Sequence, residues 1–527
     1  MPDTPAWVRD AVFYEIFPDR FAASDRVPKP GPLEAWDAPP TYDGFKGGDL
    51  LGVAEHLDHI ESLGATAIYL TPIFQSASNH RYHTFDYLAV DPLLGGDEAL
   101  RELLDRAHGR GIRIVLDGVF NHTGRGFWPF HHVLETGAGS PYRHWFHLDQ
   151  EALDRGLPID AYPAAHERLG VAIDQPHPGE VEGPDGDSLA RLGYRGWWDM
   201  PALPKLNVAD PAVREHLWAV AEHWLRFGID GWRLDVPAEI DDRSFWAEFR
   251  DRCRAVNPEA YLVGEIWHVA PDWLSGDRFD GLMNYPLAKA ILGFVAGEAT
   301  DWTLIRRHHE YAQIEELDGA AFGEALGSIL GAYASETNAA QLNLLASHDT
   351  PRALAMLGGD RVALELAVLL QAVLPGAPCV YYGDEVGVSG GHDPDNRRAF
   401  PWDEAHWDRE LLAAVRSTIG LRRREAALRS DGLAIAAAAG RAVALLRGAV
   451  GNGAGPEAGV LVVALNAGAE ATLLQSDGSV GPGRGDGGLD VLHVTGAGAS
   501  GDIVAGLEDG RLRLGLPPRT GLVARLR

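Results

Sequence analysis

The chain has 527 residues, too many for one hydrophobic core, so we expect two or three domains. It is 46% hydrophobic and 23% charged, as in ordinary globular proteins, and no apolar run approaches the roughly 18 residues that a membrane span needs. The net charge of −29 disfavours nucleic acid and anionic membranes as partners and fits a neutral substrate.

The first residues, MPDTPAWVRDAVFYEIFP, contain no basic region followed by an apolar one and therefore show no secretory signal. We expect a cytoplasmic protein, or a secreted one from which a signal peptide has been removed. The two cysteines, Cys253 and Cys379, lie in segments typical of a helix and a buried strand. We expect both to be small core side chains and not a disulfide.

Short apolar runs alternate with longer amphipathic runs up to about residue 430. The apolar runs predict strands at 11–18, 65–72, 111–120, 230–236, 260–267, 281–286, 341–348 and 377–385, and helical patterns cover 50–64 and 97–111. Eight strands that alternate with helices predict an α/β fold with a parallel sheet, and eight is the strand number of a closed (β/α)8 TIM barrel. The alternative is an open doubly wound sheet, which is disfavoured because the first strand–helix turn lacks a glycine-rich phosphate-binding pattern.

Residues 121–205 interrupt this alternation with a stretch rich in His, Pro, Gly and Trp. Such a stretch is too long for a plain loop, so we expect an inserted subdomain after the third strand, beside the active face of the barrel. From residue 429 on, short alternating runs separated by glycine-rich turns predict an antiparallel β-sandwich domain. The predicted domains are the barrel (1–120 and 206–428), the insertion (121–205) and the C-terminal domain (429–527).

Charged residues stand at the predicted C-terminal ends of several strands. Arg233 and Asp235 lie in the otherwise apolar GIDGWRLDV and share one face of their strand, because strand side chains alternate. Glu265 ends the fifth strand and Asp349 follows the seventh. Together with Asp235, these carboxylates converge at the C-terminal end of the predicted barrel. A single carboxylate there would usually form a salt bridge or a helix cap. Several desolvated carboxylates raise one another's pKa at a cost in stability, which indicates a function.

Converging carboxylates suit glycoside hydrolysis or two-metal hydrolysis. A metal site requires histidines and carboxylates at ligand spacing, but no H-E-x-x-H is present and the histidines of the insertion lie away from the strand ends. We therefore assign no metal ligands and no required cofactor.

Several motifs resemble those of a known family. DGVFNH (117–122), GWRLDVPAE (231–239), GEIWH (264–268) and NLLASHDT (343–350) resemble, in this order, the four signature regions of the α-amylase superfamily, glycoside hydrolase family 13. LPKLN (203–207), NHRYHTFDY (79–87) and GGHDPDNRRAFPW (390–402) are similar to the neopullulanase, cyclomaltodextrinase and maltogenic amylase group.

The resemblance implies a retaining mechanism, with Asp235 as the nucleophile and Glu265 as the acid and then the base. Asp349 would bond sugar hydroxyls at subsite −1. Arg233 would keep Asp235 ionised, because a nearby cation lowers the pKa of a carboxylate.

The same resemblance implies further substrate contacts. His122 and His348 would bond hydroxyls of one glucose, and Tyr82 would stack on its ring. Trp267 would form a wall on the leaving-group side, with core packing as the alternative. Asp393 and Arg397 resemble a pair that holds glucose at the non-reducing side, with a loop salt bridge as the alternative.

The sequence departs from the family pattern in two respects. Many members of the group carry an N-terminal β-domain that mediates dimerisation; here the first strand begins near residue 11, so we expect that domain to be absent and leave monomer and homodimer open. Asn121 matches a calcium-binding position, but Glu239 stands where a histidine is common, and a second calcium loop retains only Asp25 and Asp49. A structural calcium is therefore left open.

We expect an α-glucan hydrolase that acts on α-1,4 bonds of maltooligosaccharides, cyclodextrins, starch or pullulan. Transfer of glucosyl groups is a second outcome, because a sugar hydroxyl can intercept the covalent intermediate. The alternatives are an α-glucosidase or a glucan-isomerising transferase of the same family, and a non-catalytic amylase-like binding protein. Such binding proteins usually lack one of the three carboxylates, and all three are present here.

Overall fold

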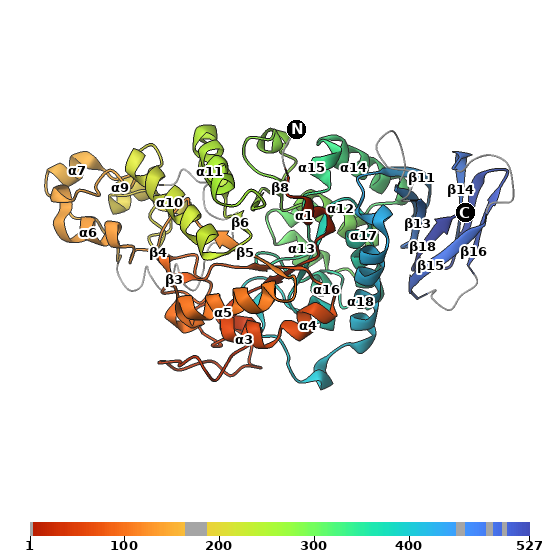
Figure 1. Ribbon diagram of the computed structural model, residues 1–527, viewed down its shortest axis with the longest axis horizontal. Helices are drawn as coiled ribbons and strands as arrows, with labels where there is room; N and C mark the ends of the chain where they lie inside the picture. Colours follow the sequence, from red (N-terminus) through yellow and green to blue (C-terminus); the bar gives the residue numbers. More distant parts are fainter. Residues whose placement is uncertain (1–3, 164–186, 449–458, 481–487, 498–502) are drawn as a thin grey trace.

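The computed structural model describes residues 4–163, 187–448, 459–480, 488–497 and 503–527 (Figure 1). Its centre is an eight-stranded parallel sheet formed by β1 (Phe13–Ile16), β2 (Ala67–Leu70), β5 (Arg113–Gly118), β6 (Gly231–Leu234), β7 (Tyr261–Gly264), β8 (Gly281–Leu282), β9 (Leu342–Asn343) and β10 (Ala377–Tyr381). The eight predicted strands are confirmed. Each is shorter than predicted, because the apolar run that marks a strand continues into the buried loop beyond it.

The sheet closes into a barrel. Its strands pair in the order β8-β7-β6-β5-β2-β1-β10-β9, and a parallel bridge between Met283 and Leu342 joins the two ends. The Asn284 amide adds a hydrogen bond of 2.8 Å to the Leu342 carbonyl across the same seam. The predicted (β/α)8 barrel is therefore confirmed, and the open doubly wound alternative is wrong.

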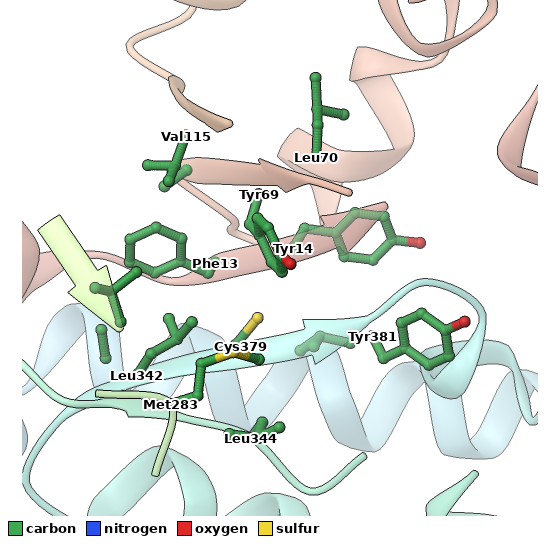
Figure 2. Close-up of a cluster of buried hydrophobic side chains, with 14 of the residues drawn as sticks. Phe13, Tyr14, Tyr69, Leu70, Val115, Met283, Leu342, Leu344, Cys379 and Tyr381 are labelled. Carbon is green, nitrogen blue, oxygen red and sulfur yellow. The ribbon is translucent and has the colours of Figure 1, made fainter. Parts of the chain in front are cut away.

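Side chains from several strands form the barrel core. Figure 2 shows Phe13, Tyr69, Val115, Leu342 and Cys379, which come from β1, β2, β5, β9 and β10 and are all buried. Parallel strands are covered on both faces and therefore read as continuous apolar runs. This burial is why the sequence predicted the barrel strands so well.

Helices surround the barrel or lie in its loops: α1 (Ala6–Asp10), α2 (Pro18–Phe21), α3 (Leu50–Glu55), α4 (Leu57–Ser62), α5 (Gly96–His108), α10 (Pro211–Phe227), α11 (Arg243–Val256), α12 (Tyr285–Val295), α13 (Trp302–Arg306), α14 (Gly319–Gly331), α15 (Ser335–Asn338), α16 (Ala353–Met356), α17 (Arg361–Val373) and α18 (Arg409–Arg424). The single helix predicted at 50–64 is wrong at His56, which separates α3 from α4 and whose ring lies 3.8 Å from the ring of Trp402. That contact between distant segments has no local sequence signal. None of the helices in the described ranges is long and apolar enough to cross a membrane.

The region between β5 and α10 forms one end of the molecule. It contains α6 (Trp128–Thr136), α7 (Gln150–Asp154) and α9 (Ser188–Leu192), which lie together at the left of Figure 1. Residues 164–186 of the predicted insertion lie outside the described residues. A hairpin of β3 (Phe74–Ser76) and β4 (Thr84–Val90) follows β2. Both segments leave the barrel at the C-terminal ends of strands, so they flank the face where a barrel carries its site.

The opposite end holds two antiparallel sheets. One contains β11 (Leu433–Ala439), β12 (Ala442–Gly448), β13 (Val460–Asn466), β18 (Thr520–Leu526) and β15 (Leu489–Gly496); the other contains β14 (Thr472–Ser479), β17 (Arg511–Leu516) and β16 (Val504–Glu508). The antiparallel C-terminal architecture predicted from the alternating runs is confirmed.

A buried arginine on β12 joins the barrel to these sheets, and a second one on α18 holds the barrel segments beside it. Arg422 Nη1 on α18 donates to the carbonyls of Ala372 at 2.8 Å and Leu428 at 3.0 Å. Arg447 on β12 donates to the carbonyls of Val373 at 2.6 Å and, again, Leu428 at 3.0 Å. Burial lowers the pKa of both guanidiniums to about 9. Carbonyl oxygens, more than carboxylates, therefore hold the two cations in place.

Replacement of Arg422 by methionine should destabilise the barrel segments that Arg422 holds. The carbonyls of Ala372 and Gly376 lose a donor, and each buried acceptor left unpaired costs about 1–3 kcal/mol. We expect a fall in the free energy of unfolding of roughly 3 kcal/mol, measured by urea unfolding followed by tryptophan fluorescence. The control is Arg416→Met on the same helix, because Arg416 is exposed and such changes stay within about 0.5 kcal/mol. Equal shifts in the two variants would contradict the role of Arg422.

Candidate active site

Arg233 lies at the centre of four carboxyl groups. Its Nη1 lies 2.9 Å from Asp117 Oδ2 and 3.0 Å from Asp235 Oδ1, and its Nη2 lies 2.8 Å from Glu265 Oε2 and 3.9 Å from Asp349 Oδ2. The side chain of Arg233 is 0% exposed. The structure therefore brings together the three carboxylates singled out in the sequence and adds a fourth, Asp117.

The barrel strands place these groups. Asp117 on β5 and Arg233 on β6 are register partners, so their side chains point the same way. Asp235 and Glu265 are the first residues beyond β6 and β7. Their amides extend the sheet, with bonds of 3.1 and 3.0 Å to carbonyls of the neighbouring strand. Sheet hydrogen bonds thus hold the backbones of both residues.

Val236 has a left-handed backbone, with φ 34° and ψ 52°. A β-branched residue is strained there, at a cost of about 1–3 kcal/mol. The turn points the Val236 amide at Glu265 Oε2, at 3.0 Å, while the Trp267 indole donates to Glu265 Oε1 at 3.0 Å. Two N–H groups therefore orient Glu265. By contrast, the buried Asp235 Oδ2 accepts no hydrogen bond from any residue that the structure describes.

Asp349 lies between a guanidinium and an imidazole. Arg397 Nη2 is 3.5 Å from Asp349 Oδ1, and His348 Nε2 is 3.1 Å from Asp349 Oδ2. Arg397 Nη1 also lies 3.1 Å from Asp393 Oδ2. The pair predicted from the loop sequence is therefore formed, and through Arg397 it adjoins the carboxylate cluster.

His348 is part of a buried chain of hydrogen bonds. Its Nδ1 lies 2.7 Å from Glu15 Oε1, and its Nε2 lies 2.5 Å from the Tyr82 hydroxyl, which is 2.8 Å from Asp117 Oδ2. The Tyr69 hydroxyl donates to the same Asp117 oxygen at 2.6 Å. Burial lowers the pKa of His348 to about 4, so its ring is neutral at pH 7.

Glu15 and Tyr69 were not among the residues predicted for the site. Glu15 did carry a signal, because it is a lone carboxylate within the apolar strand β1, where a charged residue needs a partner. Tyr69 carried none, since a tyrosine in a buried strand is also an ordinary core residue.

Two further predicted residues, His122 and Trp267, each stack on another aromatic ring. His122 stacks on Trp197 with ring centroids 4.7 Å apart and an interplanar angle of 7°, and burial lowers the pKa of His122 to about 3. Trp267 stacks on Tyr285 at 3.6 Å and 11° and remains partly exposed. Packing thus covers one face of Trp267, while its indole N–H reaches Glu265. Trp197 and Tyr285 were also missed, because aromatic residues carry no local mark of a site.

Burial raises the pKa of all four carboxyls around Arg233, and that of Asp117 rises to about 6. Arg233 opposes the rise, while the charge of Glu265 raises the pKa of Asp235 further and Asp349 does the same to Glu265. Four ionised carboxyls against the two guanidiniums of the site would leave excess negative charge in a buried pocket. The cluster is therefore suited to retain a proton near neutral pH.

Two carboxylates at the positions that the family resemblance linked to calcium pair with lysines. Glu239 Oε2 lies 2.8 Å from Lys205 Nζ, and Asp49 Oδ2 lies 3.1 Å from Lys29 Nζ. An ammonium thus holds the carboxylate at both positions, whereas the buried Asn121 Oδ1 accepts no hydrogen bond from the residues that the structure describes. Within the described ranges, no group of three or more His, Cys, Asp or Glu side chains is arranged to hold a metal ion.

Comparisons with known proteins agree with this site. The family described as alpha amylase, catalytic domain, matches residues 15–419. The chain is 42% identical over 436 residues to a cyclomaltodextrinase of Geobacillus thermopakistaniensis, covering 82% of this chain and 66% of the relative. It is 40% identical over 428 residues to neopullulanase 2 of Thermoactinomyces vulgaris, covering 81% of this chain and 64% of the relative.

A solved structure matches along the whole chain. The debranching enzyme of Nostoc punctiforme, in its native form, is 42% identical, with a TM-score of 0.83 and 100% of both chains covered. The two curated relatives are longer, and the chain spans about two thirds of their length, 66% and 64%. The family resemblance of the motifs is confirmed by these matches, and the chain belongs to the α-amylase family, glycoside hydrolase family 13.

Proposed function

We propose that the protein is a retaining α-glucan hydrolase that cleaves α-1,4-glucosidic bonds in maltooligosaccharides, cyclodextrins, starch or pullulan. The observation that carries this proposal is the group of Asp235, Glu265 and the partly exposed Asp349 around the buried Arg233 at the strand ends of a barrel. The names cyclomaltodextrinase and neopullulanase of the relatives support the same class of substrate.

In the first step, Asp235 Oδ2 attacks the anomeric carbon. This oxygen accepts no hydrogen bond within the described part of the chain, while Oδ1 is held by Arg233 at 3.0 Å. The carbon–oxygen bond to the leaving sugar breaks as the bond to Asp235 forms, and Glu265 gives its proton to the leaving oxygen. The raised pKa of Glu265, caused by burial, suits that donation.

In the second step, Glu265 acts as the base. Its carboxylate takes a proton from water, the water oxygen bonds to the anomeric carbon, and the bond to Asp235 breaks. Two displacements on opposite faces retain the α-configuration. A sugar hydroxyl in place of water would give glucosyl transfer by the same bond changes.

The surrounding side chains would hold the glucose that reacts. Asp349 and the neutral ring of His348 face the cluster and would bond ring hydroxyls, in contacts that strengthen in the transition state. His122 and Tyr82 would bind the same unit, and the Asp393–Arg397 pair would bind the non-reducing side. Trp267, which contacts Glu265, would meet the leaving sugar.

A second candidate is hydrolysis of α-1,6 bonds. Its support is the match to the debranching enzyme of Nostoc punctiforme over the full length of both chains. An α-glucosidase would use the same covalent intermediate and water but release a terminal glucose, and a glucan-isomerising transferase would pass the intermediate to a sugar hydroxyl. A cytoplasmic location and a monomeric or homodimeric state complete the proposal, and cell fractionation and gel filtration test them.

Product analysis tests the proposal and separates its candidates. The purified protein is incubated with maltotriose, longer maltooligosaccharides, β-cyclodextrin, pullulan, panose and trehalose, and the products are followed by chromatography and proton NMR. We expect cleavage of α-1,4 bonds with fresh product in the α-anomeric form, because two displacements retain configuration. Fresh β-anomer would rule out the retaining scheme, and the absence of turnover on every sugar would rule out a hydrolase.

Substitution of the two reacting carboxyls should have different effects. Asp235→Asn removes the nucleophile, and we expect kcat on maltotriose to fall roughly 10⁴-fold or more. Glu265→Gln removes the proton donor, which contributes about 10²–10⁴-fold. The Glu265→Gln loss should shrink on an aryl α-maltoside, whose leaving group needs no proton. The control is Asp230→Asn, a buried aspartate just before β6 that contacts His108, with unchanged activity expected. Wild-type turnover in either site variant would contradict the assigned roles.

The charge of Arg233 should set the acid limb of the pH profile. Lysine keeps the charge, but one ammonium cannot contact all the carboxyls that the guanidinium reaches. The pKa of Asp235 then rises, since a nearby cation lowers a carboxylate pKa by about 1–3 units, and the acid limb of kcat/KM moves to higher pH. The control is Arg250→Lys, because Arg250 forms a buried pair with Asp280 at 2.8 Å outside the site. An unchanged acid limb in Arg233→Lys would disprove the role of Arg233.

A further inference from the structure

Asp349 differs from the other two carboxylates in how its backbone is held. Asp235 and Glu265 directly follow their strands, and sheet bonds hold their amides. Strand β9 ends at Asn343, so residues 344–348 separate it from Asp349. The Asp349 amide lies 3.2 Å from the Ser347 side chain, not in a sheet ladder. Something other than the sheet must therefore fix the direction of the Asp349 side chain.

Asn396 bonds the backbone on both sides of Asp349. Its Nδ2 donates to the carbonyl of His348 at 2.7 Å and to the carbonyl of Thr350 at 2.9 Å. An amide group has two N–H hydrogens, so both bonds form at once. Asn396 is 0% exposed, and water therefore does not compete for these carbonyls. The His348 carbonyl lies in the peptide plane before Asp349 and the Thr350 carbonyl in the plane after Thr350, so the two bonds restrict the backbone on either side of the Asp349–Thr350 peptide.

The carbonyl of Asp349 itself is held from another loop. His308 Nε2 lies 3.0 Å from the Asp349 carbonyl, and His308 Nδ1 accepts from the Tyr311 amide at 3.2 Å. The proton of the neutral ring is therefore on Nε2, which donates to Asp349; burial lowers the pKa of His308 to about 3. Side chains thus cap three successive carbonyls, those of residues 348, 349 and 350.

Asn396 is itself anchored to the barrel. The buried Arg352 donates to the Asn396 carbonyl at 2.9 Å and to the carbonyl of Tyr382, just beyond β10, at 2.8 Å. The neighbouring Arg397 donates through Nε to the His348 carbonyl at 2.9 Å, while its Nη2 faces Asp349. The loop that carries Arg397 and the turn that carries Asp349 therefore form one hydrogen-bonded unit.

We propose that Asn396 is the positioning residue of Asp349. By holding the carbonyls of His348 and Thr350, it aims the Asp349 carboxylate at the reacting sugar and ties it to the loop of Asp393 and Arg397. The role rests on the proposed hydrolase function and adds to it a residue that touches neither substrate nor reacting atoms. Without Asn396, the fold remains, but the Asp349 carboxylate is no longer held in one orientation.

A pair of buried asparagines provides a matched test. We compare Asn396→Ala with Asn343→Ala, because Asn343 is also 0% exposed and donates to one carbonyl, that of Pro375, at 2.8 Å. Both variants should lose similar thermal stability. Only Asn396→Ala should lose kcat on maltotriose, by about 10²-fold, since misplacement by about 1 Å has that effect. KM should change little, because contacts of Asp349 strengthen in the transition state. Equal loss of kcat in the two variants would overturn the proposal.

A double-mutant cycle separates positioning from general damage. On an aryl α-maltoside, Asn396→Ala is measured alone and in the Asp349→Ala background. If Asn396 acts through Asp349, the second substitution has no further effect on kcat in that background. Additive losses would overturn the proposal. If Asn396→Ala does not fold, Asn396→Ser replaces it: its hydroxyl restores one bond, so we expect a smaller loss with the same non-additivity.

The wild-type protein separates this inference from the proposed function. Absence of turnover by the wild type on every α-glucan would overturn both. Wild-type turnover together with full activity of Asn396→Ala would overturn only the role of Asn396.

Discussion

The site depends on one buried cation. Arg233 is enclosed in the barrel and lies within 4 Å of the carboxyl groups of four different residues. Without it, burial would drive those carboxyls to their neutral forms, because a charge without a partner is costly in a low-dielectric interior. With it, the cluster has enough positive charge to keep one carboxylate ionised and too little to ionise all of them. Acid and nucleophile can then coexist beside the same guanidinium.

The barrel supplies two kinds of support for this cluster. Asp235 and Glu265 are held where the parallel sheet ends, so their positions follow from strand register. Asp349 lies beyond a two-residue strand and is held by side chains from two other loops. Loops are more variable and mobile than strands, so a catalytic group on a loop needs such additional bonds. The difference explains why buried polar residues concentrate around Asp349.

Lysines pair with two carboxylates at positions that the family resemblance linked to calcium. Lys205 pairs with Glu239 beside the insertion, and Lys29 pairs with Asp49 near the start of α3. An ammonium neutralises a carboxylate with no need for further oxygen ligands, whereas calcium takes six to eight. At these two positions the chain itself provides the positive charge beside the carboxylate.

The sequence by itself determined the eight strands, the antiparallel C-terminal region, the family and the carboxylates at the strand ends. Each depends on local signals: apolar runs, alternation along a strand, and short motifs. Only the tertiary structure decided how the barrel closes and what surrounds each carboxylate. Glu15 and His348 are 333 residues apart, and Asn396 reaches His348 across 48 residues. No periodicity records such pairs, because a hydrogen bond between distant residues depends on the packing of every element between them.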